Sequence, residues 1–382
     1  MKLVAIYPVG TSSGTDGVSS KPVIDFLVGA LHELGVEVQI ISLSLEGHGE
    51  ELSPARDEMS KPIASVVSPP AELFGTRRPK GFGQLRLWWW LTKTLLKSTE
   101  RGEQIIVYHS MRYIVPIFVL KLFKRIRVLL YVGEFFQTLY PMSRWKQMLE
   151  KRYIAMGDAY IFVTRLLVEQ VSKLRKQPFE YALLYGPYRS EENVAEQMEF
   201  SPLTRLLYVG KISSDKGIDR TLALAKYLDS TFEIRIVGYC EQYSEDSLLA
   251  NIAQSNEQHA CKIYFDGLKY GDEYIQYVQH CQLGLVLQDM DATYNTNSFP
   301  SKVLSFLANG LEVIAPNIPT IGSSPFVNSV YLYEDENPAN IAEIIKTIDL
   351  SKKRNDATLL DALREEFVTA VGALIAPLTD NR

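Results

Sequence analysis

Two lysines with the spacing of an anion site follow a predicted strand in the middle of the chain. The apolar run Leu206–Val209 ends at Gly210, Lys211 and Lys216 follow, and a helix is expected to begin near Ile218. Glycine allows a ligand to approach the backbone closely, and lysines at the mouth of a strand can hold a phosphate group. The alternative interpretation is two solvated lysines in a surface loop.

A second potential anion site lies at the start of a predicted helix further along the chain. Pro300 or Ser301 opens this helix, and Gly310 ends it. Backbone N–H groups near Ser301 and Lys302, together with the helix dipole, could bind a diphosphate. The alternative interpretation is an ordinary capped helix.

Together the two segments resemble the donor-binding half of GT-B-fold glycosyltransferases, most closely those of family 4, which are retaining and use nucleotide sugars. Three shorter motifs of that family occur between them in the expected order: Ile236-Val237-Gly238, Phe265-Asp266-Gly267 and Cys281 to Leu285. The resemblance covers essentially the second half of the chain and, more loosely, its N-terminal opening. It implies a donor site formed by Gly210, Lys211, Lys216, Gly238, Asn297, Pro300, Ser301, Lys302 and Ser305.

The sequence departs from the family pattern at charged positions of this site. Lys211 stands where the family has an arginine, which keeps the charge but loses the bidentate fork. Asn297 and Ser305 replace a pair of glutamates, of which the second normally holds the ribose hydroxyls. Ser305 is shorter and uncharged, so that contact is expected to be weakened or made elsewhere. Lys302 is the residue expected to compensate in part at the phosphates.

The N-terminal half offers three further candidates at strand ends. Gly17 ends a glycine-rich loop, from Gly10, that resembles the loop approaching the donor phosphates in the family. His109 and Glu134 each follow a predicted strand. The resemblance implies that Glu134 contacts the transferred sugar or acts as an acid or base, and that His109 contacts the acceptor. The alternatives are a flexible turn, a structural histidine and a surface carboxylate.

One acidic triplet, Asp289-Met290-Asp291, matches the metal-binding D-x-D of the other glycosyltransferase fold class, GT-A. It falls late, after a second α/β series has begun, where GT-A would not place it. We therefore expect a loop near the sugar pocket and no bound metal.

Strands and helices alternate along the whole chain in two series. A βαβ opening is expected in the first, and residues 44–82 are expected to form a long loop. The polar stretch Ser190 to Ser201 separates the series. We predict an α/β protein of two Rossmann-like, doubly wound domains facing across a cleft: residues 1–195 for the acceptor, residues 196–358 for the donor, and a C-terminal helix in 359–382 that packs back on the first domain.

Composition excludes a disordered or collagen-like chain, since hydrophobic residues make up 46% of the 382 residues and charged residues 22%. The formal net charge of −5 hides an asymmetry, because residues 77–152 hold sixteen Lys and Arg against four Asp and Glu. The aromatic and basic residues 77–127 favour contact with an anionic membrane surface. A core helix with a solvated basic face is the alternative. No nucleic-acid motif is present.

The resemblance thus implies a metal-independent hexosyltransferase that moves a sugar, with retention, from a nucleotide diphosphate sugar to a lipid-linked or oligosaccharide acceptor in the synthesis of cell-surface polysaccharides or glycoconjugates. Lys211 and Lys216 would stabilise the leaving diphosphate, with no cofactor needed. The three cysteines, in no CxxC spacing, indicate a cytoplasmic protein. The basic and aromatic residues 77–127 predict that it is peripherally attached to the inner face of the membrane. A non-catalytic relative acting as a scaffold or regulatory subunit is the main alternative, and a GT-B-fold sugar-nucleotide epimerase is another.

Overall fold

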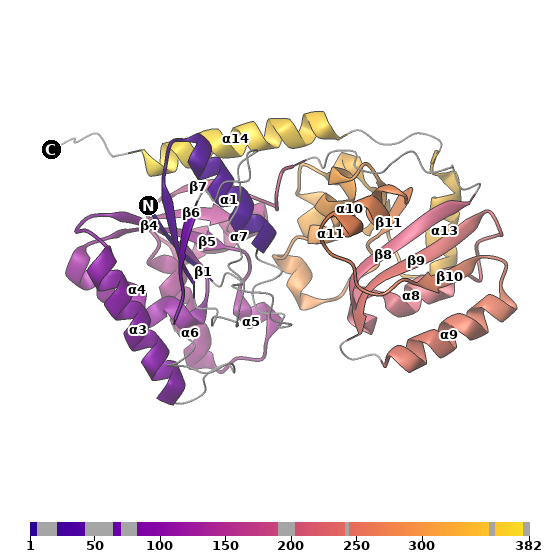
Figure 1. The fold of residues 1–382 in the computed structure, drawn as a ribbon, viewed down its shortest axis with the longest axis horizontal. Coiled ribbons are helices and arrows are strands. Elements are labelled where there is room, and N and C mark those ends of the chain that lie inside the picture. Colours follow the sequence, from indigo (N-terminus) through magenta and orange to yellow (C-terminus); the bar gives the residue numbers. More distant parts are fainter. Residues whose placement is uncertain are drawn as a thin grey trace. The chain divides into compact units, whose positions relative to one another are not determined.

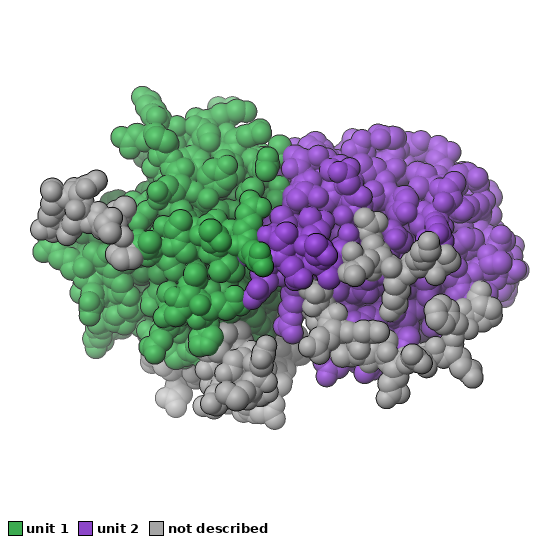
Figure 2. Space-filling view, turned by 90° about the horizontal axis from the view of Figure 1, so that it is seen from above, with its two compact units in different colours: residues 1–187, 365–382 green, residues 188–364 purple. Residues whose placement is uncertain are grey.

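A computed structural model describes residues 1–5, 21–42, 64–69, 82–189, 203–240, 244–350 and 356–376. The chain divides into two compact units, residues 1–187 with 365–382 and residues 188–364 (Figure 2). The predicted boundary near residue 195 lies outside the described residues. So do the loop from Gly10 to Gly17 and the basic residues Arg77, Arg78 and Lys80.

Unit 1 is built on a seven-stranded parallel sheet of order β3-β2-β1-β4-β5-β6-β7 (Figure 1). Its strands are β1 (Lys2–Ala5), β2 (Val38–Ser42), β3 (Ala64–Val67), β4 (Gln104–Tyr108), β5 (Arg127–Val132), β6 (Ala159–Phe162) and β7 (Glu180–Leu183). Its helices are α1 (Lys21–Glu33), α3 (Phe82–Ser98), α4 (Ile114–Lys124), α5 (Phe136–Leu139), α6 (Arg144–Ala155) and α7 (Arg165–Leu174).

Strand and helix patterns in unit 1 follow from where their apolar residues fall. The central strands are apolar without interruption because both faces of a parallel sheet are covered by helices. Helix α3 buries Leu87, Leu91 and Leu95, which are four residues apart and so share one helix face. These leucines join the core formed around β4, β5 and α4.

The last helix, α14 (Ala357–Ile375), adds its second half to unit 1. The rings of Phe26 and Phe367 lie 5.7 Å apart, and the Gln104 side chain donates a hydrogen bond of 3.0 Å to the Leu374 carbonyl. Figure 1 shows this part of α14 running beside α1. Apolar packing against α1 and a hydrogen bond from β4 thus join the second half of α14 to unit 1.

Unit 2 repeats the same architecture with a six-stranded parallel sheet of order β10-β9-β8-β11-β12-β13. Its strands are β8 (Thr204–Ile212), β9 (Phe232–Cys240), β10 (Lys262–Phe265), β11 (Leu283–Leu285), β12 (Glu312–Pro316) and β13 (Tyr331–Tyr333). Its helices are α8 (Ile218–Leu224), α9 (Glu245–Gln258), α10 (Gly271–Gln279), α11 (Ser301–Ala308), α12 (Pro319–Gly322) and α13 (Pro338–Thr347). Counted from its first strand, this order is the doubly wound order of dinucleotide-binding folds, in which ligands bind beyond the carboxyl ends of the strands.

Several elements differ from the sequence prediction, and three strands show why. Residues 64–67, expected inside a long loop, form the edge strand β3, which pairs with β2. Strand β13 was also missed. Strand β8 continues past its expected end at Val209 to Ile212, because Gly210, Lys211 and Ile212 pair with the extended end of β9. Short edge strands and ladder extensions depend on a partner strand, so a single segment carries little sign of them.

No helix in the described part of the chain combines the length and apolar composition needed to cross a membrane.

Candidate functional site

Two glycines bring the backbones of β8 and β9 together at the carboxyl edge of the unit 2 sheet. Gly210 has a φ of +97°, and it pairs with Gly238. A Cβ atom at Gly238 would lie 1.8 Å from the Gly210 carbonyl oxygen, so no side chain fits there. A Cβ atom at Gly210 would lie 3.4 Å from Cε of Lys302. The side chain of Lys302, from α11, thus lies directly over Gly210, within van der Waals distance of a Cβ atom placed there.

Two lysine ammonium groups rest on tyrosine rings beside these glycines. Nζ of Lys302 lies 4.4 Å from the centre of the Tyr208 ring, and Nζ of Lys216 lies 3.8 Å from that of Tyr294. Cation–π contact stabilises each charge without neutralising it. Desolvation by burial, and then the charge of Lys216, lower the pKa of Lys302 to about 7. We call Lys216 and Lys302 the lysine pair.

Asp215 is the acidic neighbour of the lysine pair. Its carboxylate accepts a hydrogen bond of 2.6 Å from the Ser213 hydroxyl and lies 3.4 Å from Nζ of Lys216. Burial works to raise the pKa of Asp215, but the Ser213 hydrogen bond and the charges of Lys216 and Lys211 outweigh it and hold that pKa below its usual value. Lys211, on β8, therefore also contributes positive charge to this edge.

Helix α11 begins at this edge, as predicted from its sequence. Pro300 is its N-cap residue, and Ser301, the first helical residue, is exposed. Asn297 is fully buried and precedes the helix. The Ser305 hydroxyl lies 3.1 Å from the hydroxyl of Tyr274 on α10, so it already has a neutral partner. The two positions where the resembling family carries glutamates thus hold a buried amide and one half of a hydroxyl pair.

In unit 1, His109 lies just beyond β4 and is only 3% exposed. Its ring packs 4.9 Å from Phe136 and 5.7 Å from Tyr153, between ring centres. Burial lowers the pKa of His109 to about 4, although a hydrogen bond to the Glu134 backbone works in the opposite direction. This hydrogen bond joins the two strand-end residues that the sequence singled out. His109 is therefore a neutral, enclosed imidazole near neutral pH.

Glu150, on α6, is a functional candidate that sequence reasoning missed. It is fully buried, and its carboxylate accepts hydrogen bonds of 2.6 Å from the Phe136 N–H and 3.2 Å from the Gln137 N–H. One carboxylate oxygen lies 3.8 Å from Nε2 of His109. Burial raises the pKa of Glu150. The carboxylate thus accepts hydrogen bonds from the first turn of α5, which begins two residues after Glu134. Glu150 and this turn come together only in the folded chain.

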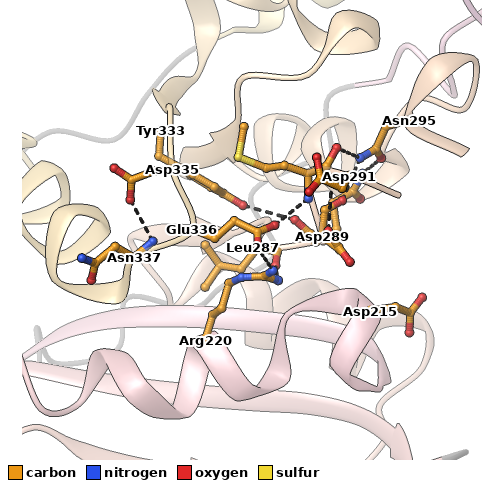
Figure 3. A network of polar contacts seen from close by, with 12 residues as sticks. Asp215, Arg220, Leu287, Asp289, Asp291, Asn295, Tyr333, Asp335, Glu336 and Asn337 are labelled. Carbon is orange, nitrogen blue, oxygen red and sulfur yellow. Dashed lines mark hydrogen bonds and ion pairs between the residues drawn. The ribbon is translucent and has the colours of Figure 1, made fainter. Parts of the chain in front are cut away.

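The Asp289-Met290-Asp291 triplet forms part of a tightly bonded turn after β11. The Asp291 N–H donates to the Asp289 carboxylate at 3.0 Å, and Asn295 donates to the carbonyls of Asp289 and Met290 at 2.7 and 3.0 Å. Figure 3 shows these residues as one network. Within the described ranges, no three His, Cys, Asp or Glu side chains are grouped so that they could hold a metal ion.

Solved structures share this architecture over the whole chain. A structure described as trehalose-6-phosphate from Escherichia coli, bound with UDP-2-fluoro glucose, superposes with a TM-score of 0.67 at 11% sequence identity, covering 98% of each chain. HepE from Anabaena, in complex with UDP and glucose, superposes with a TM-score of 0.65 at 14% sequence identity, and the match again covers 98% of each chain. An α,α-trehalose-phosphate synthase (UDP-forming) from Burkholderia xenovorans superposes with a TM-score of 0.65 at 10% sequence identity, covering 97% of this chain and 98% of the other.

This chain has the GT-B fold. The predicted α/β architecture of two Rossmann-like sheets is thereby confirmed, since these neighbours are GT-B glycosyltransferases. No protein-family model matches the sequence, and no curated protein sequence matches it. Assignment to family 4 stays a prediction, because the likeness at such low identity is one of fold.

Several residues at the site carry no sequence signal. Tyr208 looks like an ordinary buried strand residue, and Tyr294 lies in a polar segment without periodicity. Tyr274 is one of several aromatics on its helix. Each acquires its role from a partner that is distant in sequence. The structure brings together the predicted Gly210, Lys211, Lys216 and Lys302, and it places Gly238 behind them as a packing residue.

Proposed function

We propose that this protein is a glycosyltransferase that transfers a hexose from a nucleotide diphosphate sugar to a lipid-linked or oligosaccharide acceptor, with retention and without a metal. The observation that carries the proposal is the lysine pair at the carboxyl edge of the unit 2 sheet, beside the start of α11. UDP or UDP sugars are bound in structures of similar fold, such as HepE.

The lysine pair suits the charge that develops when the sugar leaves the diphosphate. As the bond from the sugar to the phosphate oxygen breaks, that oxygen gains negative charge, and Lys216 and Lys302 would stabilise it. The oxygen of the acceptor hydroxyl forms the new bond to the sugar, and its proton passes to the departing diphosphate oxygen. The backbone N–H groups of Ser301 and Lys302, at the start of α11, would add hydrogen bonds to the phosphates. Glu134, in unit 1, is proposed to contact the transferred sugar. His109 is only 3% exposed, which supports the alternative of a structural histidine over contact with the acceptor.

Titration calorimetry with UDP, GDP and their glucose conjugates tests the donor site. We expect binding by the full chain, followed by slow release of free sugar from the cognate sugar nucleotide. Lys216→Ala should weaken binding about tenfold or more, because it removes a charge-assisted contact to phosphate. Lys226→Ala, which changes a lysine of unit 2 that lies over Tyr227 instead, is the matched control. Absence of binding at millimolar nucleotide concentrations would refute the proposed glycosyltransferase function.

One observation favours a second candidate function, that of a non-catalytic scaffold or regulatory subunit. Neither Asn297 nor Ser305 has a carboxylate to bind the ribose hydroxyls. In addition, Asn297 is buried and the Ser305 hydroxyl is already paired with that of Tyr274. A chain that binds nucleotide but releases no sugar from any sugar nucleotide would support the scaffold. Sugar release that Lys216→Ala abolishes would support the enzyme.

We also propose that unit 1 contacts an anionic membrane surface through α3 and α4, which pack against each other. Large apolar side chains on these helices are more than half exposed: Leu85, Trp89, Phe118, Leu122 and Phe123. Nζ of Lys93 lies 4.6 Å from the Trp89 ring centre, and Arg86, Lys97 and Arg125 are exposed nearby in sequence. Aromatic and cationic side chains together suit the headgroup region of anionic lipids.

Co-sedimentation with vesicles containing phosphatidylserine tests this surface. We expect binding that weakens with salt, and loss of binding in the double variant Trp89→Ala with Phe123→Ala. Tyr270→Ala, which removes an equally exposed aromatic from unit 2, is the control. Binding that ignores both salt and headgroup charge would contradict the proposal.

A further inference from the structure

The turn that carries Lys216 rests on a second loop through the carbonyl oxygen of Asp215. This oxygen accepts a hydrogen bond of 3.1 Å from the Asp289 N–H and one of 3.2 Å from the Tyr294 hydroxyl. Tyr294 also provides the ring over which Nζ of Lys216 lies. Residues 287–296, which follow β11, therefore set both the backbone and the ammonium position of Lys216.

An ion pair between residues of two other elements forms hydrogen bonds to the backbone of this second loop (Figure 3). Arg220, on α8, donates to the Leu287 carbonyl at 3.1 Å and pairs with the carboxylate of Glu336, which follows β13. The same carboxylate accepts a hydrogen bond of 2.6 Å from the Met290 N–H. One Arg–Glu pair thus holds both ends of the turn 287–290. We call Arg220 and Glu336 the clamp.

Close packing makes Lys216 sensitive to the position of this turn. A Cβ atom at Gly217 would lie only 1.8 Å from the Leu287 carbonyl oxygen, the same oxygen that Arg220 contacts. Gly217, at φ +86°, directly follows Lys216. A displacement of Leu287 would therefore be passed on to the turn that carries Lys216.

We propose that Glu336 is a positioning residue for phosphate binding, acting through the turn 287–290 and Tyr294 on Lys216. This inference rests on the proposed donor site. Glu336 does not itself suit contact with a diphosphate, because its carboxylate would repel one and both of its oxygens are already engaged. The clamp instead fixes the position of the Lys216 ammonium group before UDP binds, so binding does not have to offset the entropy cost of ordering that side chain.

A double-mutant cycle with UDP as the probe tests the inference. Glu336→Ala should weaken UDP binding by the full chain about five- to tenfold, the size typical of coupling through an intervening element. In the Lys216→Ala background the same change should cost less than about twofold, because Glu336 then has nothing to position. Glu336→Gln, which keeps an acceptor for the Met290 N–H, should recover part of the affinity. Glu334→Ala, which removes a neighbouring exposed carboxylate paired with Asn317, is the matched control.

The outcomes separate this inference from the proposed function. Two results would overturn the inference alone, provided that the wild type binds UDP. One is that the losses of affinity in Glu336→Ala and Lys216→Ala are additive in the double variant, and the other is an unchanged affinity in Glu336→Ala. Failure of the wild type to bind UDP, GDP or ADP overturns the proposed donor site and the inference together. If circular dichroism shows that Glu336→Ala does not fold, the Glu336→Gln cycle replaces it with the same criterion of non-additivity.

Discussion

Raising the pH from 7 to 9 should weaken UDP binding, because Lys302 loses its charge over this range. Burial and the charge of Lys216 lower the pKa of Lys302 to about 7 in the free protein. A diphosphate beside Nζ favours the charged form, so above this pH binding must first protonate the lysine. Below it the ammonium is already formed. Affinity is therefore highest at or below pH 7 and falls as the pH rises.

The magnitude follows from the fraction of Lys302 that is charged. About half is charged at pH 7 and about 1% at pH 9, so the apparent dissociation constant should rise by up to about 50-fold, the limit reached when only the charged form of Lys302 binds. The UDP phosphates add little, since a terminal phosphate with a pKa near 6 is almost fully ionised above about pH 7.

Titration calorimetry at pH 7, 8 and 9, in two buffers of different ionisation enthalpy, measures the affinity and the protons taken up. Lys302→Met should bind weakly at every pH. Lys302→Arg should bind without this pH dependence, because a guanidinium stays charged throughout. Lys346→Met, on α13, removes a lysine that is paired with Glu343 and should keep the wild-type profile. A wild-type affinity that changes less than twofold between pH 7 and 9, or a Lys302→Met variant with the wild-type slope, would refute the reasoning.

Three stability predictions follow from other contacts. Gly217→Ala should lower the free energy of unfolding, measured in urea, by more than about 2 kcal/mol, because the new Cβ atom would overlap the Leu287 carbonyl. Gly267→Ala, at a similar positive φ but with open space around it, should lower that free energy by only about 1–2 kcal/mol, and equal losses in the two variants would contradict the packing argument. His109 should be charged more easily in the unfolded state, so stability should fall as the pH drops from about 6.5 to 4, by up to about 3 kcal/mol, and His109→Gln should remove this contribution in urea titrations at pH 5 and 7.5. Glu150→Ala should cost about 2–4 kcal/mol in the same assay, because two N–H groups of α5 lose their acceptor, and a loss below 1 kcal/mol would show that this cap is not needed.

Much of the fold could be predicted from local patterns. The βαβ alternation, the span of α11 from Ser301 to Ala308 and the start of α8 at Ile218 were all predicted, because apolar periodicity and the Pro and Gly positions act within a few residues. Strand β3 was missed, since a four-residue edge strand is defined by its ladder with β2.

The candidate site was predictable only in part. Lys216 and Lys302 could be singled out because each stands at a strand-to-helix junction, where the backbone itself favours anions. Their tyrosine supports could not, since Tyr208 and Tyr294 are each more than 70 residues from one of the groups they contact. Glu150 was likewise hidden, because a buried carboxylate in a helix has the same local pattern as a solvated one.

The sequence by itself determined the alternation of strands and helices, the ends of α11, and the presence of cationic residues at the loops after β8 and before α11. It did so because those features depend on neighbours within one or two turns of chain. Only the tertiary structure decided that Lys302 lies over Gly210 and Tyr208, that Lys216 lies over Tyr294, and that Arg220 and Glu336 hold the turn 287–290. The physical reason is that burial, and with it the electrostatics of a lysine, depends on which distant segments the parallel sheet brings to one edge.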